Sequence, residues 1–183
     1  MMALVLVLSA SLLLLSGVSA TSFNVVIHCG NTLGVQVAEN SGGPSIGTSG
    51  FSLAPGQSQR LSPPNGWAGN IGTGVPGLLA EFSINIQANT DHYDVSAVNG
   101  FFLDLGMSIT GDGQSLSCSA AASICPATDV SGSACVSPNR DDPNSSYAQN
   151  VRASCPDVFS WSGDNTKDHG TPTGGTFTIT FCP

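Results

Sequence analysis

The chain has 183 residues, of which 4 are Lys or Arg and 12 are Asp or Glu, so its formal net charge is −8 at pH 7. Its few cations are scattered, which excludes the clustered basic surface of a nucleic-acid-binding protein, and we expect no nucleic acid partner. A negative balance favours solubility and is compatible with a neutral polysaccharide, which carries no charge to be repelled.

The chain opens with a nearly continuous apolar run over residues 1–20 that ends in Val18-Ser19-Ala20. Small residues at this end suit a signal peptidase site, so we predict a secretory signal peptide cleaved after Ala20. The run is short for a bilayer span of about 20 residues, and an uncleaved anchor is the alternative. We expect residues 21–183 to form one secreted, monomeric domain with no stable membrane insertion.

Segments rich in Val, Ile, Phe and Thr alternate with Gly, Pro, Asn and Ser clusters, and no long stretch holds an apolar period of 3.6 residues. The sequence therefore predicts an all-β fold. Residues 23–29 and 33–39 are expected to form an opening hairpin. Residues 177–181 are expected to form the last strand, with their first, third and fifth side chains facing inward.

The middle of the chain shows the clearest alternation. In the segment 79–87, one face carries Ala80, Phe82, Ile84 and Ile86, and the other carries Glu81, Ser83, Asn85 and Gln87. After a short turn, the segment 91–98 places His92, Asp94 and Ser96 on one face. Antiparallel pairing of the two strands would merge their polar faces. Asn99-Gly100 then signals a two-residue hairpin turn into another strand.

Between about residues 110 and 167 the composition changes to Ser, Ala, Asp, Asn and Pro, with four of the six cysteines. Order there must come from cross-links more than from a core, and we expect a disulfide-braced, loop-rich lobe. An even number of cysteines on an exported route favours disulfides, although spacing alone cannot choose the pairs. Zinc ligation is the rival, but Cys-x2-Cys spacing is missing. Asn144-Ser145-Ser146 matches the N-glycosylation pattern, which makes Asn144 a candidate acceptor.

Two cysteine-anchored signatures, CPDVFSW at 155–161 and FTITFCP at 177–183, resemble the thaumatin-like proteins. Shorter blocks at 21–29, 79–85, 93–101 and 124–127 match the same family in the same order. The resemblance implies a flattened β-sandwich with a disulfide-rich lobe and an acidic cleft between them. It also implies three disulfides: Cys29 with Cys182, Cys118 with Cys155, and Cys125 with Cys135.

In many defence-related relatives the cleft is lined by one Arg, one Glu and three Asp. The resemblance assigns three of these positions to Glu81, Asp94 and Asp157. Asn99 replaces the fourth acid. The family's Arg should follow Trp67, where this chain has no cation. Both departures weaken a full transfer of the family's activity.

Hydrolysis of a glycoside needs one protonated and one ionised carboxyl group. Glu81 is the expected acid because apolar residues flank it and neighbouring carboxylates would raise its pKa. Asp94 or Asp157 would then activate water. The alternative is structural: Glu81 and Asp94 occupy a solvated sheet face, and Asp157 caps a turn beside a disulfide.

The leading hypothesis is a secreted, defence-type, antifungal protein that binds β-1,3-glucan. A weak endo-β-1,3-glucanase, an inhibitor of a foreign hydrolase and a membrane-perturbing toxin are alternatives. The dispersed histidines suggest no metal site, and we expect no cofactor. Pyranose rings rest on aromatic faces, and the sequence offers five candidates without choosing among them: Trp67, Tyr93, Phe101, Phe102 and Trp161.

Overall fold

The computed structural model describes residues 20–183. The predicted signal peptide therefore lies outside the described residues, except for Ala20, and its cleavage remains a prediction.

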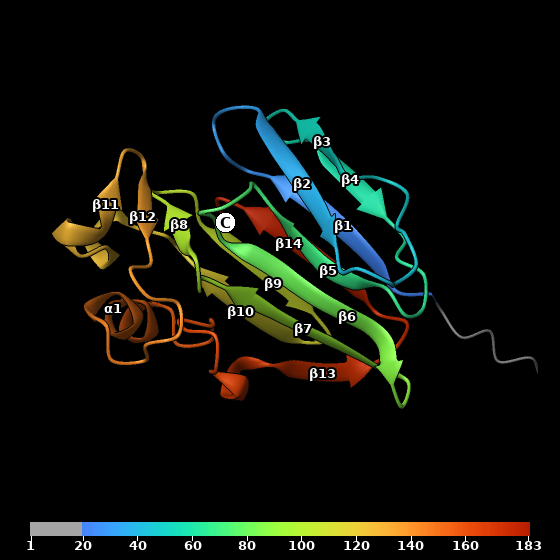
Figure 1. Ribbon diagram of the computed structural model, residues 1–183. Helices are drawn as coiled ribbons and strands as arrows, with labels where there is room; N and C mark the ends of the chain where they lie inside the picture. The colour runs from blue at the N-terminus through green and yellow to red at the C-terminus, as the bar shows by residue number, and fades with distance from the viewer. Residues whose placement is uncertain (1–19) are drawn as a thin grey trace, which may run out of the picture.

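Two main sheets and one small sheet make up the fold (Figure 1). The first sheet has the strand order β10 (Gln114–Cys118), β9 (Met107–Gly111), β14 (Thr176–Phe181), β1 (Ser22–Ile27) and β4 (Ser58–Leu61). The second has the order β13 (His169–Pro172), β7 (Thr90–Ser96), β6 (Leu79–Gln87), β5 (Ala68–Gly72), β2 (Leu33–Glu39) and β3 (Gly50–Leu53). The third has the order β11 (Val130–Ser131), β12 (Ala134–Val136) and β8 (Gly100–Phe102).

Within residues 20–183, helices are few and lie outside the sheets. They are the α-helix α1 (Ser146–Ser154) and the single 3-10 turns η1 (Ala122–Ile124), η2 (Ala127–Asp129) and η3 (Asn165–Lys167). The all-β fold predicted from the alternating pattern and the β-sandwich implied by the family resemblance are thus confirmed.

An aromatic cluster fills the space between the two main sheets. Phe23 of β1 lies 4.3 Å from Phe82 of β6 between ring centroids. Phe177 of β14 lies 5.3 Å from Phe82 and 4.8 Å from Tyr93 of β7. All four side chains are at most 4% exposed. Each buried ring contributes about 1.5–3 kcal/mol relative to exposure, so these contacts fix which face of each strand points inward.

The first strand pairs with the last rather than with its neighbour in sequence. β1 lies parallel to β14, with Phe23 opposite Phe177, and antiparallel to β4. β2 lies in the other main sheet, between β3 and β5. The predicted opening hairpin is therefore wrong, because both strands have an apolar face to bury and the chain crosses from one sheet to the facing one between them. The predicted inward residues of the last strand, Phe177, Ile179 and Phe181, are confirmed as buried.

β6 and β7 form the predicted antiparallel hairpin. Its far end departs from the alternation, because the register shifts between Ser83 and Gln87 and Asn85 adopts a left-handed conformation with φ of 49°. As a result Ile86, which we expected to face inward, is 50% exposed. The regular part of the hairpin ends before this irregularity and carries the residues discussed below.

The hairpin predicted at Asn99-Gly100 is wrong: the turn centres on Val98-Asn99, where the Gly100 N–H donates to the Ala97 carbonyl at 3.1 Å, and the strand after it does not pair with β7. Instead β8 pairs with β12 in the small sheet, with Gly100 opposite Val136. Gly100 has φ of +132°, and a Cβ atom there would lie 2.3 Å from the Cys135 carbonyl oxygen. Only glycine allows this approach, which redirects the chain from the sandwich into the lobe.

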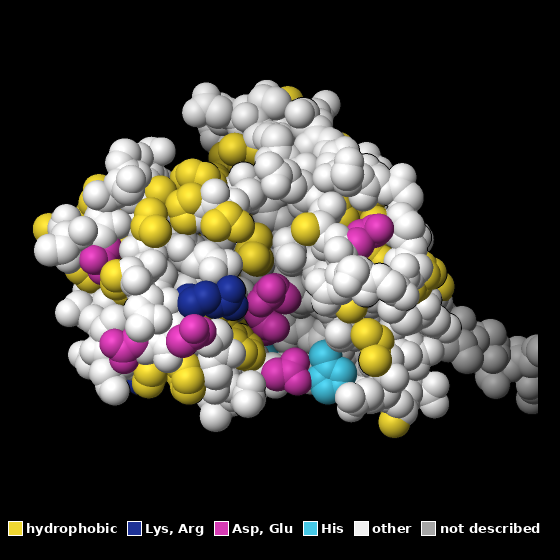
Figure 2. Space-filling view, viewed as in Figure 1, with side chains coloured by type: hydrophobic (Ala, Val, Ile, Leu, Met, Phe, Trp, Pro, Cys, Tyr) yellow, Lys and Arg dark blue, Asp and Glu magenta, His cyan; other side chains and the backbone are white. Residues whose placement is uncertain are grey.

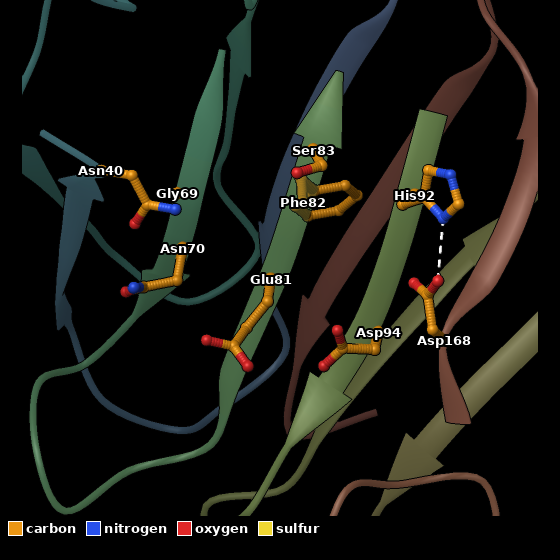
Figure 3. Close-up of a pocket in the computed structure, with 9 residues that line it drawn as sticks. All are labelled: Asn40, Gly69, Asn70, Glu81, Phe82, Ser83, His92, Asp94 and Asp168. Atoms are coloured by element: carbon orange, nitrogen blue, oxygen red, sulfur yellow. Dashed lines mark hydrogen bonds and ion pairs between the residues drawn. The ribbon is translucent and has the colours of Figure 1, made fainter. Parts of the chain in front are cut away.

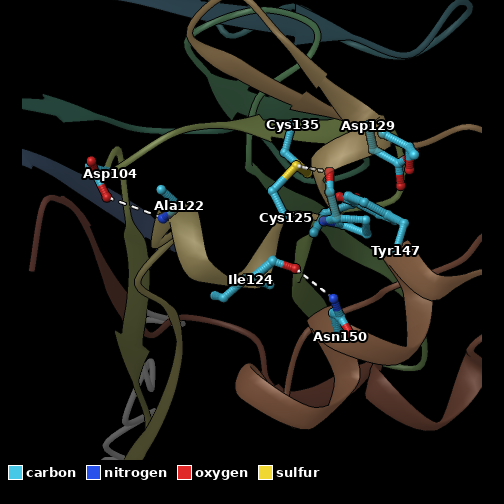
Figure 4. Close-up of a disulfide and its surroundings, with 11 residues drawn as sticks. Asp104, Ala122, Ile124, Cys125, Asp129, Cys135, Tyr147 and Asn150 are labelled. Carbon is cyan, nitrogen blue, oxygen red and sulfur yellow. Dashed lines mark hydrogen bonds between the residues drawn. A yellow bond between two sulfur atoms is a disulfide. The ribbon is translucent and has the colours of Figure 1, made fainter.

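Three disulfides join Cys29 to Cys182, Cys118 to Cys155, and Cys125 to Cys135, the pairs that the family resemblance implies. The bridge from Cys118 ties the end of β10 to the residue after α1. Figure 4 shows the bridge from Cys125, beside which the Asn150 side chain donates to the Ile124 carbonyl at 3.0 Å.

The irregular part of the lobe begins after Cys118, because β9 and β10 still belong to the first sheet. α1 begins after Ser145, whose hydroxyl accepts a hydrogen bond from the Ala148 N–H. Asn144 precedes this cap and is exposed, so it stays a candidate glycosylation site.

A buried carboxylate joins three distant segments at one end of the sandwich. Asp91 is 0% exposed. Its oxygens accept hydrogen bonds from the Thr21 hydroxyl, the Thr173 hydroxyl and the Asn85 N–H. These donors come from the residue before β1, from the loop between β13 and β14, and from β6, so one side chain joins both sheets.

Replacing this carboxylate should destabilise the protein strongly. Asp91→Ala leaves three donors without their acceptor, and each buried group left unsatisfied costs about 1–3 kcal/mol. We expect the midpoint of thermal unfolding to fall by at least about 5 °C, measured by circular dichroism. The control Asp157→Ala removes an exposed carboxyl group at a residue with ordinary negative φ, and should change little. Equal midpoints for the two variants would contradict this role.

Candidate functional site

A pocket of about 180 Å³ lies on the outer face of the second sheet. Figure 3 shows its lining residues: Asn40, Gly69, Asn70, Glu81, Phe82, Ser83, His92, Asp94 and Asp168. Most of these side chains are polar. The sequence placed Glu81, Ser83, His92 and Asp94 on one polar face, and the structure brings all four to this pocket.

The sandwich core determines which side chains reach the pocket. Phe82 and Tyr93 face inward, so their neighbours in sequence face outward. In the ladder, Asn70 of β5 lies opposite Glu81 of β6, and Glu81 lies opposite Asp94 of β7. Two carboxyl groups therefore stand on directly paired residues, an arrangement that is unfavourable when both are ionised.

Asp94 is the carboxyl group that keeps its proton. Burial raises its pKa to about 8, and the nearby carboxylates of Glu81 and Asp168 add to the rise. Its Oδ1 atom is buried and has no hydrogen-bond partner among the described residues. A protonated Asp94 is a hydrogen-bond donor at neutral pH, which an ordinary aspartate is not.

Glu81 is better placed to ionise. Burial raises its pKa, but a hydrogen bond from Ser96 and the positive charge of Arg140 act in the opposite direction. We expected Glu81 to be the acid. The larger rise of the pKa at Asp94 favours Asp94 as the proton donor instead, because Asp94 lacks such partners and faces two other carboxylates.

Arg140 is a cation that sequence reasoning missed at this site. It lies between β12 and α1, and its carbonyl accepts a hydrogen bond from the Ser162 N–H at 2.9 Å. Figure 2 shows cationic and acidic side chains adjoining near the centre of this face. The family's cation after Trp67 is absent, but Arg140 supplies a positive charge near Glu81 from a distant segment, and no pattern in the sequence near Glu81 indicates it.

The segment after Trp67 has no room for a side chain at Gly69. A Cβ atom on Gly69 would lie 2.2 Å from the Ala38 carbonyl oxygen and 2.9 Å from the Trp67 ring. No side chain fits at that position. Asn70, the next residue, points outward and supplies an uncharged amide to the pocket.

The third carboxyl group of the pocket is Asp168, not Asp157. Asp168 precedes β13, and its Oδ2 atom lies 2.8 Å from Nδ1 of His92. Asp157 is exposed, follows the disulfide at Cys155 and is absent from the pocket lining. Its proposed place among the acids thus has no support in the geometry. Asn99 instead joins the lobe to the sandwich, through its carbonyl and the Ser137 N–H.

The pair of carboxyl groups can support acid–base chemistry, and the surrounding amides and hydroxyls can bind sugar hydroxyls. Within residues 20–183, no group of three or more His, Cys, Asp or Glu side chains is arranged to hold a metal ion. In the same range, no helix has the length and apolar character needed to cross a membrane.

The raised pKa of Asp94 predicts a particular pH dependence of stability. The folded protein binds this proton more tightly than the unfolded chain, whose Asp has a pKa near 3.8. Stability from this group is therefore complete below the unfolded value and is lost as pH rises toward 8. Asp94→Asn keeps a neutral side chain at every pH. We expect its thermal midpoint to exceed that of the wild type by at least about 3 °C at pH 8 and to differ little at pH 4.

Calorimetry at a series of pH values measures this difference. The exposed Asp157→Asn is the matched control and should follow the wild-type curve. A variant Asp94→Asn whose midpoint changes with pH in parallel with the wild type would show that Asp94 titrates normally.

No protein-family model matches the chain. Curated relatives do match it along most of its length. Thaumatin-like protein 2 of Prunus persica is 31% identical over 98% of this chain and 97% of its own length. Pathogenesis-related protein 5 of Arabidopsis thaliana is 29% identical over 91% of this chain and 92% of its own. The glucan endo-1,3-beta-glucosidase of Prunus avium is 29% identical over 100% of both.

Two solved structures share the fold. The protein elicitor MoHrip2 from Magnaporthe oryzae has a TM-score of 0.54 at 15% identity, and the match covers 90% of this chain and 100% of that one. The thaumatin-like xylanase inhibitor TLXI has a TM-score of 0.52 at 17% identity, with 88% and 99% covered. At these identities the likeness concerns the fold alone, and it agrees with the fold predicted from the sequence.

Proposed function

The chain belongs to the thaumatin-like protein family, and from that membership we propose that it is a secreted, defence-type protein that binds β-1,3-glucan at the pocket on the outer face of β6 and β7. The observation that carries the proposal is the row of Asn70, Glu81 and Asp94 across three adjacent strands. This row offers an amide, a carboxylate and a protonated carboxyl group side by side.

Such a row suits a chain of sugar hydroxyls. Each hydroxyl can both donate and accept a hydrogen bond. Glu81 accepts, protonated Asp94 can donate, and the Asn70 amide and Ser83 hydroxyl do both. Because the protein carries a net charge of −8, a neutral glucan is a better partner than an acidic polysaccharide.

The relatives support the same class of role. Curated relatives that match over at least nine tenths of this chain include a pathogenesis-related protein and a glucan endo-1,3-beta-glucosidase. The second name supports glucan as the ligand here. The three disulfides also favour secretion, because disulfides persist in oxidising compartments. The apolar start of the sequence independently indicates the same route.

A second function, weak hydrolysis of β-1,3-glucan, is favoured by the Glu81–Asp94 pair. Directly opposed residues have Cβ atoms about 4.5–5.5 Å apart. The stereochemical outcome depends on the distance between the carboxyl groups themselves, about 5–5.5 Å in retaining enzymes and roughly 6.5–9.5 Å in inverting ones. In a retaining reaction, Asp94 would protonate the leaving oxygen, and Glu81 would attack the anomeric carbon before water releases the sugar.

Sedimentation with insoluble β-1,3-glucan tests the binding function, with cellulose and chitin as controls. We expect the wild-type protein to sediment with the glucan. Asn70→Ala should weaken binding about tenfold because it removes one or two hydrogen bonds. Asn31→Ala, an exposed position outside the pocket, should bind as the wild type does. If the wild-type protein sediments with no glucan, the proposal is wrong.

Release of new reducing ends from soluble β-1,3-glucan tests the hydrolytic function. We expect Glu81→Gln and Asp94→Asn each to abolish the release, and wild-type activity to decline as pH rises past about 8, where Asp94 loses its proton. Both variants must keep the wild-type circular dichroism spectrum. Activity that survives in both would refute the assignment, and a wild-type protein that binds glucan without cleaving it would leave binding as the function.

A further inference from the structure

Of the five aromatic residues that the sequence offers for stacking on a sugar ring, the structure leaves two accessible to solvent. Trp67, Tyr93 and Phe101 are at most 2% exposed and belong to the core. Phe102 and Trp161 remain partly exposed. Only a ring with an accessible face can stack on a sugar, so the first three are excluded as ligand contacts.

Trp161 lies on a loop that borders the pocket at Asp94. The chain runs beside β7 at Phe159, which bridges to Ser96 and whose N–H donates to the Val95 carbonyl at 2.9 Å. It returns to β7 at His169, which lies opposite Tyr93. Asp94 stands between these two points. The intervening loop, residues 160–168, therefore forms an edge of the pocket, and its last residue is one of the lining residues.

The indole ring of Trp161 packs against the backbone of this loop. A Cβ atom on Gly163 would lie 2.3 Å from Cζ3 and 2.6 Å from Cη2 of Trp161, so the ring rests directly against the glycine backbone. The loop itself is fastened, since the Ser162 N–H donates to the Arg140 carbonyl and its hydroxyl donates to Asp141. A ring held in place before binding loses little conformational freedom when a ligand arrives.

Phe102 is less suited to the same role. It belongs to β8 in the small sheet and lies opposite Ala134. A Cβ atom on Gly77 would lie 3.4 Å from its Cε2 atom, so its ring packs toward the turn that precedes β6. That position is not on the loop that borders Asp94.

We propose that Trp161, seated on Gly163, is the platform on which one pyranose ring of the bound glucan stacks. The inference rests on the proposed function and narrows it. In a β-linked glucose every ring substituent is equatorial, so both faces present C–H groups to an aromatic ring, whereas mannose places an axial hydroxyl on one face. A platform on this loop thus selects β-linked glucose rings over mannose, while the polar row binds their hydroxyls.

Intrinsic fluorescence can detect this contact because the chain has two tryptophans, and the other, Trp67, is 0% exposed. Titration of the wild type with a soluble β-1,3-glucan oligosaccharide should give a saturable change in emission, and a mannan oligosaccharide should give a much smaller one. Trp161→Phe should abolish the change in tryptophan emission. Trp161→Ala should weaken glucan binding about tenfold in sedimentation.

Gly163→Ala is the sharper variant, because it keeps the indole but displaces it from its seat, and binding should weaken about as much as in Trp161→Ala. Val130→Ala, which trims an exposed apolar residue on β11, is the matched control and should bind normally. If the wild type sediments with glucan, and both Trp161→Ala and Trp161→Phe bind glucan as tightly as the wild type does, the platform is refuted and the proposed function stands. If the wild type binds no glucan, the proposed function and the platform are both refuted.

Discussion

Burial of one face of the β6–β7 hairpin is the constraint from which the candidate site follows. Phe82 and Tyr93 pack against Phe177 between the sheets, and a slip of one residue would expose these side chains. With that register, Glu81 and Asp94 must stand opposite each other on the outer face. The free energy gained by burying the aromatic core outweighs the electrostatic repulsion between the two carboxyl groups. This repulsion is relieved when Asp94 retains its proton.

The lobe adds further residues to the candidate site on the sheet. The segment after Cys135, far in sequence from Glu81, contributes three residues to this region: Arg140, Trp161 and Asp168. The Cys118–Cys155 bridge and the hydrogen bonds of Phe159 with β7 hold that segment against the sandwich. The sheet thus supplies a rigid floor, and the lobe supplies a cation that favours ionised Glu81 and the loop that carries Trp161. Preorganisation of both parts reduces what a ligand must order on binding.

The sequence predicted features that depend on local alternation, and it failed where partners are distant. The polar face of β6 and β7 follows from residues two apart, so it could be read directly, whereas the bulge at Asn85 that exposes Ile86 could not. The pairing of β1 with β14 joins the two ends of the domain, and no short-range pattern encodes it. Asp168 reaches the pocket, and Arg140 comes near enough to act on Glu81, through tertiary contacts alone. The larger rise of the pKa at Asp94 could not be predicted, because flanking residues in sequence say little about burial and charge in space.

The most direct test of the account is an NMR titration of the protein labelled with ¹³C at its side-chain carboxyl groups. The account predicts that the Asp94 resonance titrates near pH 8, that Glu81 titrates at lower pH, and that Glu81→Gln lowers the Asp94 value because the facing charge is gone. An Asp94 carboxyl group that titrates near the ordinary value of about 4, or that does not respond to Glu81→Gln, would contradict it.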